Sequence, residues 1–140
     1  LRQQVSGDAR IPLRDAIRNL GLSGTWVCIA SGNNAAKAVL CSPGCINGTK
    51  VLTVGAMTCA QGCYSGPNWG TPVVDWVATG HSVYSTYKNG GYATLTGTSQ
   101  ATPVVAGIIH ARGAAPLSGG TITCGNGSVP AAAYKKAKRA

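Results

Sequence analysis

The sequence predicts an α/β fold with a mainly parallel sheet. Residues 25–30 form a continuous apolar run that leads directly into the polar segment Ser31-Gly32-Asn33-Asn34. Such a run is typical of a strand buried on both faces of a parallel sheet. Residues 50–56 repeat the pattern, and helical stretches are predicted before the first run and after the last strand. In folds of this kind functional groups gather beyond the carboxyl ends of the strands.

The remaining elements follow from periodicity and from helix-end signals. Between residues 11 and 20, Leu13, Ile17 and Leu20 recur at helical spacing, with Pro12 suited to a first turn and Gly21 to a C-terminal cap. Short strands are predicted at 73–78, 82–86 and 92–96. A helix beginning near Ser99 and ending at Gly113 is apolar almost all round, so we expect it to be buried.

The chain is expected to form a single domain. Its 140 residues are enough for one core, and no internal repeat or interdomain linker is visible. After Gly113 the sequence becomes rich in Gly, Ser, Thr and Ala and loses periodicity. We therefore expect residues 114–140 to form an irregular basic tail.

Charge and hydropathy argue against nucleic-acid binding and against a membrane span. The net charge is +9 and the pI about 9.6, but four of the twelve cationic residues lie together at 135, 136, 138 and 139. Aromatic residues do not interleave with the other cations, so nucleic-acid binding is disfavoured. A membrane span is not expected either, because no stretch approaches the ~20 apolar residues that one needs.

Six cysteines in a short chain favour an oxidising compartment. Cys41 and Cys45, like Cys59 and Cys63, are four residues apart, and the absence of a nearby histidine favours two small disulfide loops over a metal site, although 15 pairings are open. Asn47 and Asn126 each begin an N-glycosylation sequon. With a first residue, Leu1, that suggests processing, these signals predict a secreted or extracellular protein.

Ser99 is the first candidate for chemistry. It lies between a turn of small residues and an apolar helix, which places its hydroxyl at a helix N-terminus, where developing negative charge is favoured. This geometry suits a nucleophile. The alternative is that Ser99 or Thr98 only caps the helix.

A longer motif favours the nucleophile. The run that begins at Gly97 closely resembles the nucleophile motif of the subtilisin-like serine proteases, or subtilases: Gly97-Thr98-Ser99-Gln100-Ala101-Thr102-Pro103-Val104-Val105-Ala106-Gly107. Residues 29–33, 51–56, 68–70 and 74–80 resemble upstream segments of that family in the same order. The resemblance covers about residues 16–113. It implies a three-layer subtilisin-like fold, of which residues 1–140 are the C-terminal portion of a single catalytic domain.

The resemblance also implies roles for individual residues. Ser99 would attack the scissile carbonyl, while the Asn33 side-chain amide and the Ser99 backbone N–H would hold the oxyanion. Ala30, Ser31 and Gly32 would line one wall of the substrate pocket, and the loop at 42–44 would close its base. No cofactor is implied. Without the resemblance, Asn33 could equally be a loop residue in a left-handed turn.

The catalytic Asp and His of the family have no counterpart here. His81 and His110 are the only histidines, and His110 lies about three helical turns after Ser99, or roughly 16 Å. We therefore expect an N-terminal companion chain that carries the Asp and His, and peptide or protein substrates. The alternative is an inactive, protease-derived structural or binding component whose basic tail engages an acidic partner.

Overall fold

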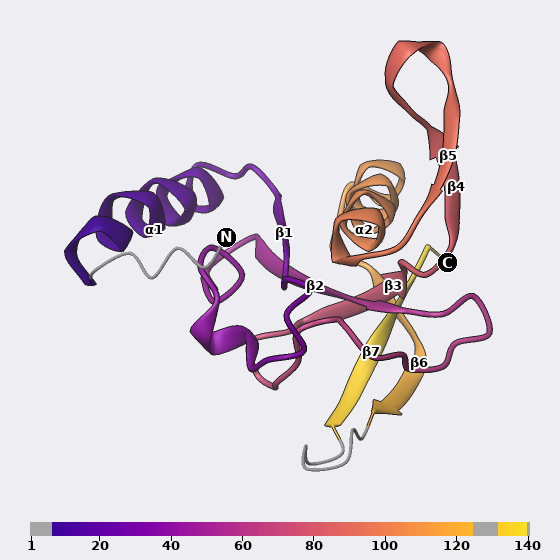
Figure 1. Ribbon diagram of the computed structural model, residues 1–140. Coiled ribbons are helices and arrows are strands. Elements are labelled where there is room, and N and C mark those ends of the chain that lie inside the picture. The colour runs from indigo at the N-terminus through magenta and orange to yellow at the C-terminus, as the bar shows by residue number, and fades with distance from the viewer. Residues whose placement is uncertain (1–6, 125–131, 140) are drawn as a thin grey trace.

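The computed structural model describes residues 7–124 and 132–139. In chain order the elements are α1 (Gly7–Leu22), β1 (Val27–Ala30), the 3-10 turn η1 (Ala38–Leu40), β2 (Val51–Met57), β3 (Trp76–Thr79), β4 (Val83–Thr86), the 3-10 turn η2 (Lys88–Gly90), β5 (Tyr92–Leu95), α2 (Thr98–Arg112), β6 (Leu117–Cys124) and β7 (Ala132–Lys138). The predicted α/β class is confirmed (Figure 1).

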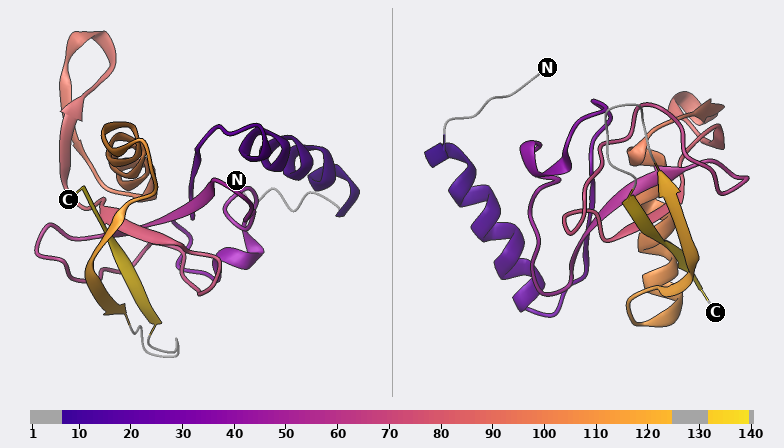
Figure 2. Two further views of the ribbon diagram at one scale, coloured as in Figure 1. Left: turned by 180° about the vertical axis from the view of Figure 1, so that it is seen from behind. Right: turned by 90° about the horizontal axis from the view of Figure 1, so that it is seen from below.

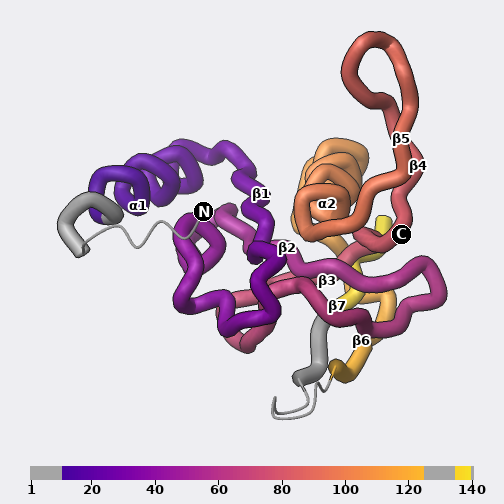
Figure 3. The backbone as a smooth tube through the Cα atoms, in the orientation of Figure 1, coloured from indigo at the N-terminus to yellow at the C-terminus, as the bar shows by residue number. Residues whose placement is uncertain are grey.

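The main sheet has the strand order β1-β2-β3-β7-β6. β1, β2 and β3 are parallel, with Val27 opposite Val51 and Val54 opposite Trp76, and β7 continues the parallel arrangement beside β3. Only β6 is antiparallel, to β7. β4 and β5 form a separate two-stranded hairpin, which projects away from the sheet beside α2 (Figure 3).

The sheet separates two layers of helix (Figure 2). Alternate side chains of β1 face opposite layers: Ile29 belongs to a cluster against which Ile17 of α1 packs, while Cys28 packs against the cluster that contains Val105 of α2. A third cluster, around Met57, Val74 and Ile122, lies under the loops that follow β1 and β2. This three-layer arrangement positions the carboxyl ends of β1, β2 and β3 next to the start of α2.

The bounds of α1 differ from expectation, whereas those of α2 agree with it. α1 runs past the predicted limits, with Pro12 and Gly21 inside it rather than at its ends. Gly21 is buried against the Thr49 carbonyl, where a Cβ would collide, so this glycine permits close packing instead of capping the helix. α2 ends at Gly113 as predicted, in the left-handed conformation with its N–H bonded to the Ile109 carbonyl.

The expectation that α2 is buried on all sides is wrong for this chain. Its buried residues, Thr98, Ala101, Val105 and Ile109, form one face that lies on the sheet. On another face Val104 is 40% exposed, and Ala106 and Gly107 are also exposed. An apolar helix is therefore covered on one side only.

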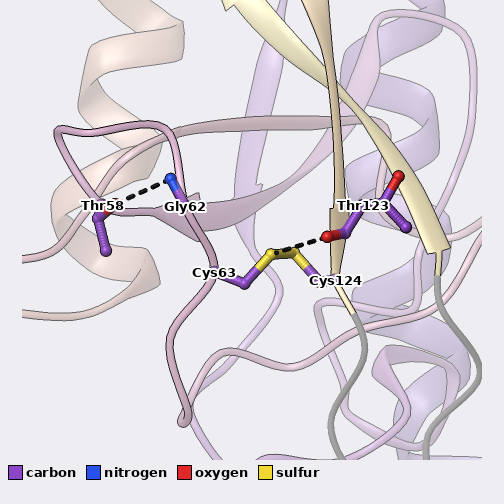
Figure 4. The surroundings of a disulfide bond; sticks show 5 residues. All are labelled: Thr58, Gly62, Cys63, Thr123 and Cys124. Atoms are coloured by element: carbon purple, nitrogen blue, oxygen red, sulfur yellow. Dashed lines mark hydrogen bonds between the residues drawn. A yellow bond between two sulfur atoms is a disulfide. The ribbon is translucent and has the colours of Figure 1, made fainter.

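The prediction of an irregular tail is also wrong where the structure describes it. β6 and β7 pair as a hairpin, with Leu117 opposite Lys138, and join the main sheet through Val77 and Lys136. A disulfide between Cys63 and Cys124 ties the end of β6 to the loop after β2 (Figure 4). This pairing overturns the expected Cys59–Cys63 loop. The Cys41–Cys45 loop is not formed either, because Cys28, Cys41, Cys45 and Cys59 are free thiols.

Lysines cover the indole rings of this acid-poor chain. Lys37 lies 5.9 Å from the ring centre of Trp69, Lys50 lies 5.6 Å from that of Trp26, and Lys135 lies 5.8 Å from that of Trp76. These distances are within the range of cation–π attraction. In the part of the chain that is described, no helix is long and apolar enough to cross a bilayer.

Candidate active site

Ser99 lies in the first turn of α2, at the carboxyl edge of the main sheet. The preceding Gly97 donates its N–H to the Gly80 carbonyl at 2.7 Å, and Gly80 donates to the Met57 carbonyl at 3.0 Å. These bonds attach the turn to the ends of β3 and β2. Ser99 itself is exposed. The N–H groups of a first helical turn have no intrahelical acceptor, so they remain available to bind negative charge.

Asn33 lies against this turn. Its Oδ1 accepts a hydrogen bond from the Thr98 N–H at 2.8 Å, and the neighbouring Gly32 N–H donates to Thr98 Oγ1 at 3.2 Å. Because Oδ1 is the acceptor, the Nδ2 group of the same amide remains a donor. Within the described residues this Nδ2 has no hydrogen-bond partner. The structure thus brings Asn33 against Thr98, the residue that precedes Ser99, although Asn33 and Ser99 are 66 positions apart in the sequence.

The loop that carries Asn33 is held by Asn68, which is 3% exposed. Asn68 Nδ2 donates to the Ser31 carbonyl at 2.8 Å, and Asn68 Oδ1 accepts from the N–H groups of Asn34 at 2.9 Å and Ala36 at 3.2 Å. The backbone N–H of Asn68 donates to the Gly32 carbonyl at 2.7 Å. One asparagine therefore bonds the chain on both sides of Asn33.

The three predicted wall residues have different surroundings. Ala30 lines the same depression as Ser99. Ser31 is fully buried, and its Oγ donates to the Asn68 carbonyl at 3.2 Å, so its side chain faces the protein interior. Gly32 has φ +103°, and a Cβ there would meet Asn68 Nδ2, so only glycine fits this position. Gly44, in the loop predicted to close the pocket, packs against the carbonyls of Ala30 and Ser31.

An open depression of about 710 Å³ extends from Ser99 along α2. One side is β1, and the other is a face of the helix. Its lining residues are Trp26, Cys28, Ala30, Ser99, Thr102, Pro103, Ala106, Ile109, His110 and Gly113. Burial raises the pKa of the Cys28 thiol, so this thiol is held in its neutral form and belongs to the apolar lining.

Neither histidine is placed to activate Ser99. His110 lies at the far end of the depression, eleven residues along α2. His81 packs edge-on against Tyr64, and its Nδ1 lies 3.1 Å from Ser82 Oγ. Among the residues described, no hydrogen bond connects the Ser99 hydroxyl to a histidine or a carboxylate. A complete triad is not present in this part of the chain.

Asn47 is half-buried, unlike a typical glycan-bearing side chain. Its Nδ2 lies 3.3 Å from the Val73 carbonyl and 3.4 Å from Asp75 Oδ2, and donates to both. A glycan on this nitrogen would cost at least one of these hydrogen bonds. Asn126, the other predicted acceptor, lies outside the described residues.

Sequence reasoning assigned no role to Asn68 and treated Thr98 only as an alternative cap. Thr98 is fully buried, and its hydroxyl and N–H both contact the Asn33 loop. Asn68 and Thr98 show no hydrophobic periodicity that would reveal their role, because their partners lie in loops that only the folded chain brings close. The family resemblance covered both positions, in the run from Gly97 and in residues 68–70, but it implied no role for either.

Comparison with known proteins decides the family. The model of the subtilase family matches residues 5–112, more than half of the sequence. The chain belongs to the subtilase family. Among curated subtilases it is 37% identical over 108 residues to the subtilisin-like serine protease Pen c 1 of Penicillium citrinum, an alignment that covers 77% of this chain and 26% of the relative.

Two further subtilases are similar to this chain over a comparable stretch. Alkaline serine exoprotease A of Vibrio alginolyticus is 36% identical over 104 residues, covering 74% of this chain and 19% of its own length. The crystal structure of a cold-adapted subtilisin-like serine proteinase superposes with a TM-score of 0.64 at 38% identity, over 69% of this chain and 34% of that one. This subtilase chain thus spans about a quarter of the length of the curated relatives it matches.

Proposed function

We propose that this chain supplies the nucleophile and the oxyanion hole of a subtilisin-type serine endopeptidase. Ser99 Oγ attacks the peptide carbonyl, and the oxygen that becomes negative is held by Asn33 Nδ2 and the Ser99 N–H. Collapse of this intermediate releases the amine and leaves an acyl-enzyme on Ser99, which water then hydrolyses. The substrates in this proposal are peptides and proteins.

The contact between the Thr98 N–H and Asn33 Oδ1, at 2.8 Å, is the observation that carries the proposal. It fixes which way the amide of Asn33 is turned and leaves Nδ2 as a donor beside Ser99. A helix cap would need only a serine or threonine at the start of α2. Asn33, 65 positions before Thr98, caps this N–H through Oδ1, and the other end of the amide, Nδ2, is the kind of donor that stabilises an oxyanion.

The Asp and His of the triad belong, in this proposal, to an N-terminal companion chain. Two features of the fold support this part. β1 pairs only with β2, so among the described strands it leaves one edge of backbone N–H and C=O groups without a neighbour. The depression beside it, lined largely by apolar side chains of β1 and α2, forms a surface that begins at Ser99. A companion that covers this surface would bring its residues next to Ser99.

A secreted location is part of the proposal. The disulfide between Cys63 and Cys124 supports it, since such bonds persist mainly in oxidising compartments. Glycosylation of Asn47 and Asn126 stays a prediction.

The test is covalent labelling of the natively purified protein with a serine-directed fluorophosphonate, followed by separation of its chains under reducing conditions. We expect label on this 14.1 kDa chain, at Ser99, because only an activated hydroxyl reacts. Ser99→Ala should abolish the label. Ser65→Ala, a change at another exposed serine, should leave it intact.

The companion is tested in the same experiment. Loss of labelling when the chains are separated before the probe is added, and its return on mixing, would identify the chain that supplies the base. A native preparation that stays unlabelled beside a reactive subtilisin would reject the enzymatic proposal. The basic binding component described above would then become the better account.

A further inference from the structure

We propose that Asn68 is a positioning residue that holds the Asn33 amide in register with Ser99. This inference rests on the proposed function, because it concerns the oxyanion site of the same reaction. Asn68 lies in the loop between β2 and β3, far in sequence from both residues that it would position. It touches no reacting atom in this proposal and acts through the loop of residues 31–36.

The contacts of Asn68 enclose Asn33 on both sides. Before Asn33, the Ser31 and Gly32 carbonyls accept from Asn68 Nδ2 and from the Asn68 N–H. After Asn33, the N–H groups of Asn34 and Ala36 both donate to Asn68 Oδ1. Asn33 itself is exposed and makes no contact with Asn68 that would restrict its side chain directly. Its backbone is thus fixed while its amide stays accessible.

An amide is the side chain that these partners require. One end must donate to a carbonyl while the other accepts from two N–H groups, and both ends are buried, so an atom left without a partner would be destabilising. The left-handed Gly32 completes the fit, because any side chain there would occupy the space of Asn68 Nδ2. Asn68 and Gly32 are therefore matched to each other.

The same loop is bonded to the nucleophile turn. The Gly32 N–H donates to Thr98 Oγ1, and Asn33 Oδ1 accepts from the Thr98 N–H. A shift of the loop would change the distance between Asn33 Nδ2 and the carbonyl under attack. Misplacement of a catalytic group by about 1 Å can cost on the order of 100-fold in rate. Asn68 is thus expected to affect the rate of acylation through the position of Asn33.

The first experiment measures hydrolysis of a chromogenic peptide by the native assembled protein. Loss of one oxyanion donor costs about 10²–10³-fold in kcat, and Asn68→Ala should cause part of that loss, roughly tenfold to a hundredfold, with a smaller change in KM. Asn19→Ala, at an exposed asparagine of α1, should leave both constants unchanged. An unaltered kcat in Asn68→Ala would overturn the inference.

A double-mutant cycle separates positioning from general loss of structure. If Asn68 acts through Asn33, then in an Asn33→Ala background the further change Asn68→Ala should lower kcat by less than about threefold, because the donor is already gone. If the two losses instead multiply in full, Asn68 has only a structural role and the inference is rejected.

Asn68→Asp provides a variant that keeps the shape of the side chain. It retains the acceptor for Asn34 and Ala36 but places an oxygen against the Ser31 carbonyl, so kcat should fall while overall folding is kept. Hydrogen exchange measured by mass spectrometry should show faster exchange in residues 31–36 and unchanged exchange in α2 beyond its first turn. Unchanged exchange in residues 31–36 would overturn the inference.

The two proposals fail in different ways. If the wild-type protein neither labels at Ser99 nor cleaves peptides, the proposed function is rejected and the positioning role is rejected with it. If the wild-type protein is active but the cycle is multiplicative, only the role of Asn68 is rejected.

Discussion

At the scale of single residues, Asp75 shows how burial and hydrogen bonding compete. Its carboxylate accepts from the Thr53 N–H at 2.7 Å and from Asn47 Nδ2 at 3.4 Å. Desolvation by burial nevertheless raises the pKa of Asp75 above its ordinary value of 3.8, against the opposing effects of the Thr53 hydrogen bond and the charge of Lys135. The folded protein therefore holds this proton more tightly than the unfolded chain does.

This direction gives a signed prediction for pH dependence. Because the folded pKa is the higher one, Asp75 contributes stability below pH 3.8 that is lost as the pH rises through the folded pKa. Asp75→Asn keeps an acceptor for Thr53 and Asn47 without the charge. We expect the melting temperature of the variant, relative to that of the wild type, to increase as the pH is raised from about 3 to 7.

Thermal melts at a series of pH values test this prediction. Asp15→Asn is the matched control, since Asp15 is an exposed carboxylate paired with Arg14 on α1, and it should show little difference at any pH. Parallel melting curves for Asp75→Asn and the wild type across the whole pH range would refute the assignment.

At the scale of elements, the junction between β3 and α2 depends on close backbone approach. A Cβ at Gly80 would meet the Gly97 carbonyl and the Ala56 Cβ, each at 2.6 Å. We predict that Gly80→Ala lowers the free energy of unfolding by about 1–3 kcal/mol through overpacking. It should also slow fluorophosphonate labelling, because Gly97 adjoins the nucleophile turn.

Chemical denaturation and labelling rates measured on the same samples check the Gly80 prediction. Gly91→Ala is the control: the nearest atom to its added Cβ is at 3.5 Å, an ordinary contact, so the change should stay within about 0.5 kcal/mol. If the two variants have equal stability, the junction is less tightly packed than described.

The elements also show what the sequence can and cannot predict. Strands β1 and β2 were predictable because buried parallel strands are continuous apolar runs, and α2 because its motif and Gly113 mark its ends. β6 was not predictable, because it is mostly exposed Gly, Ser and Thr, with Ile122 buried, and backbone pairing to β7 holds it. Residues 73–75 were predicted as strand, but Val74 donates to the Gly70 carbonyl in a turn.

In the candidate site, too, the sequence predicts some residues and not others. Ser99 and Asn33 could be proposed from the sequence because each lies in a short local motif, and the fold then showed Asn33 bonded to Thr98, next to Ser99. Asn68 acts through contacts that loop closure creates, and no local pattern encodes them. The burial of only one face of α2 could not be predicted either. An apolar helix indicates burial, but its sequence does not show whether its own chain or another one covers each face.

At the scale of the whole molecule, the disulfide between Cys63 and Cys124 joins the sheet's last hairpin to its centre. It closes a loop with a sequence separation of 61 residues. Replacing both cysteines by serine should lower the free energy of unfolding by about 2–4 kcal/mol, mainly because the unfolded chain gains freedom. The β6–β7 hairpin should then become the first region that a protease cuts.

Denaturation of the double variant and limited proteolysis measure this effect. Cys59→Ser, at an exposed free thiol, should change the stability little. A protein whose melting temperature is the same with and without a reducing agent would show that the bond does not constrain the fold.

The pairing of each tryptophan with a lysine has an optical consequence. All three indoles of the chain lie beneath an ammonium group, and the three pairs belong to different parts of the fold. A positive charge over an indole face changes the energy of its excited state, so the intrinsic fluorescence reports on the lysines above the rings. Acetylation, which removes that charge, can therefore be followed by emission without an added dye.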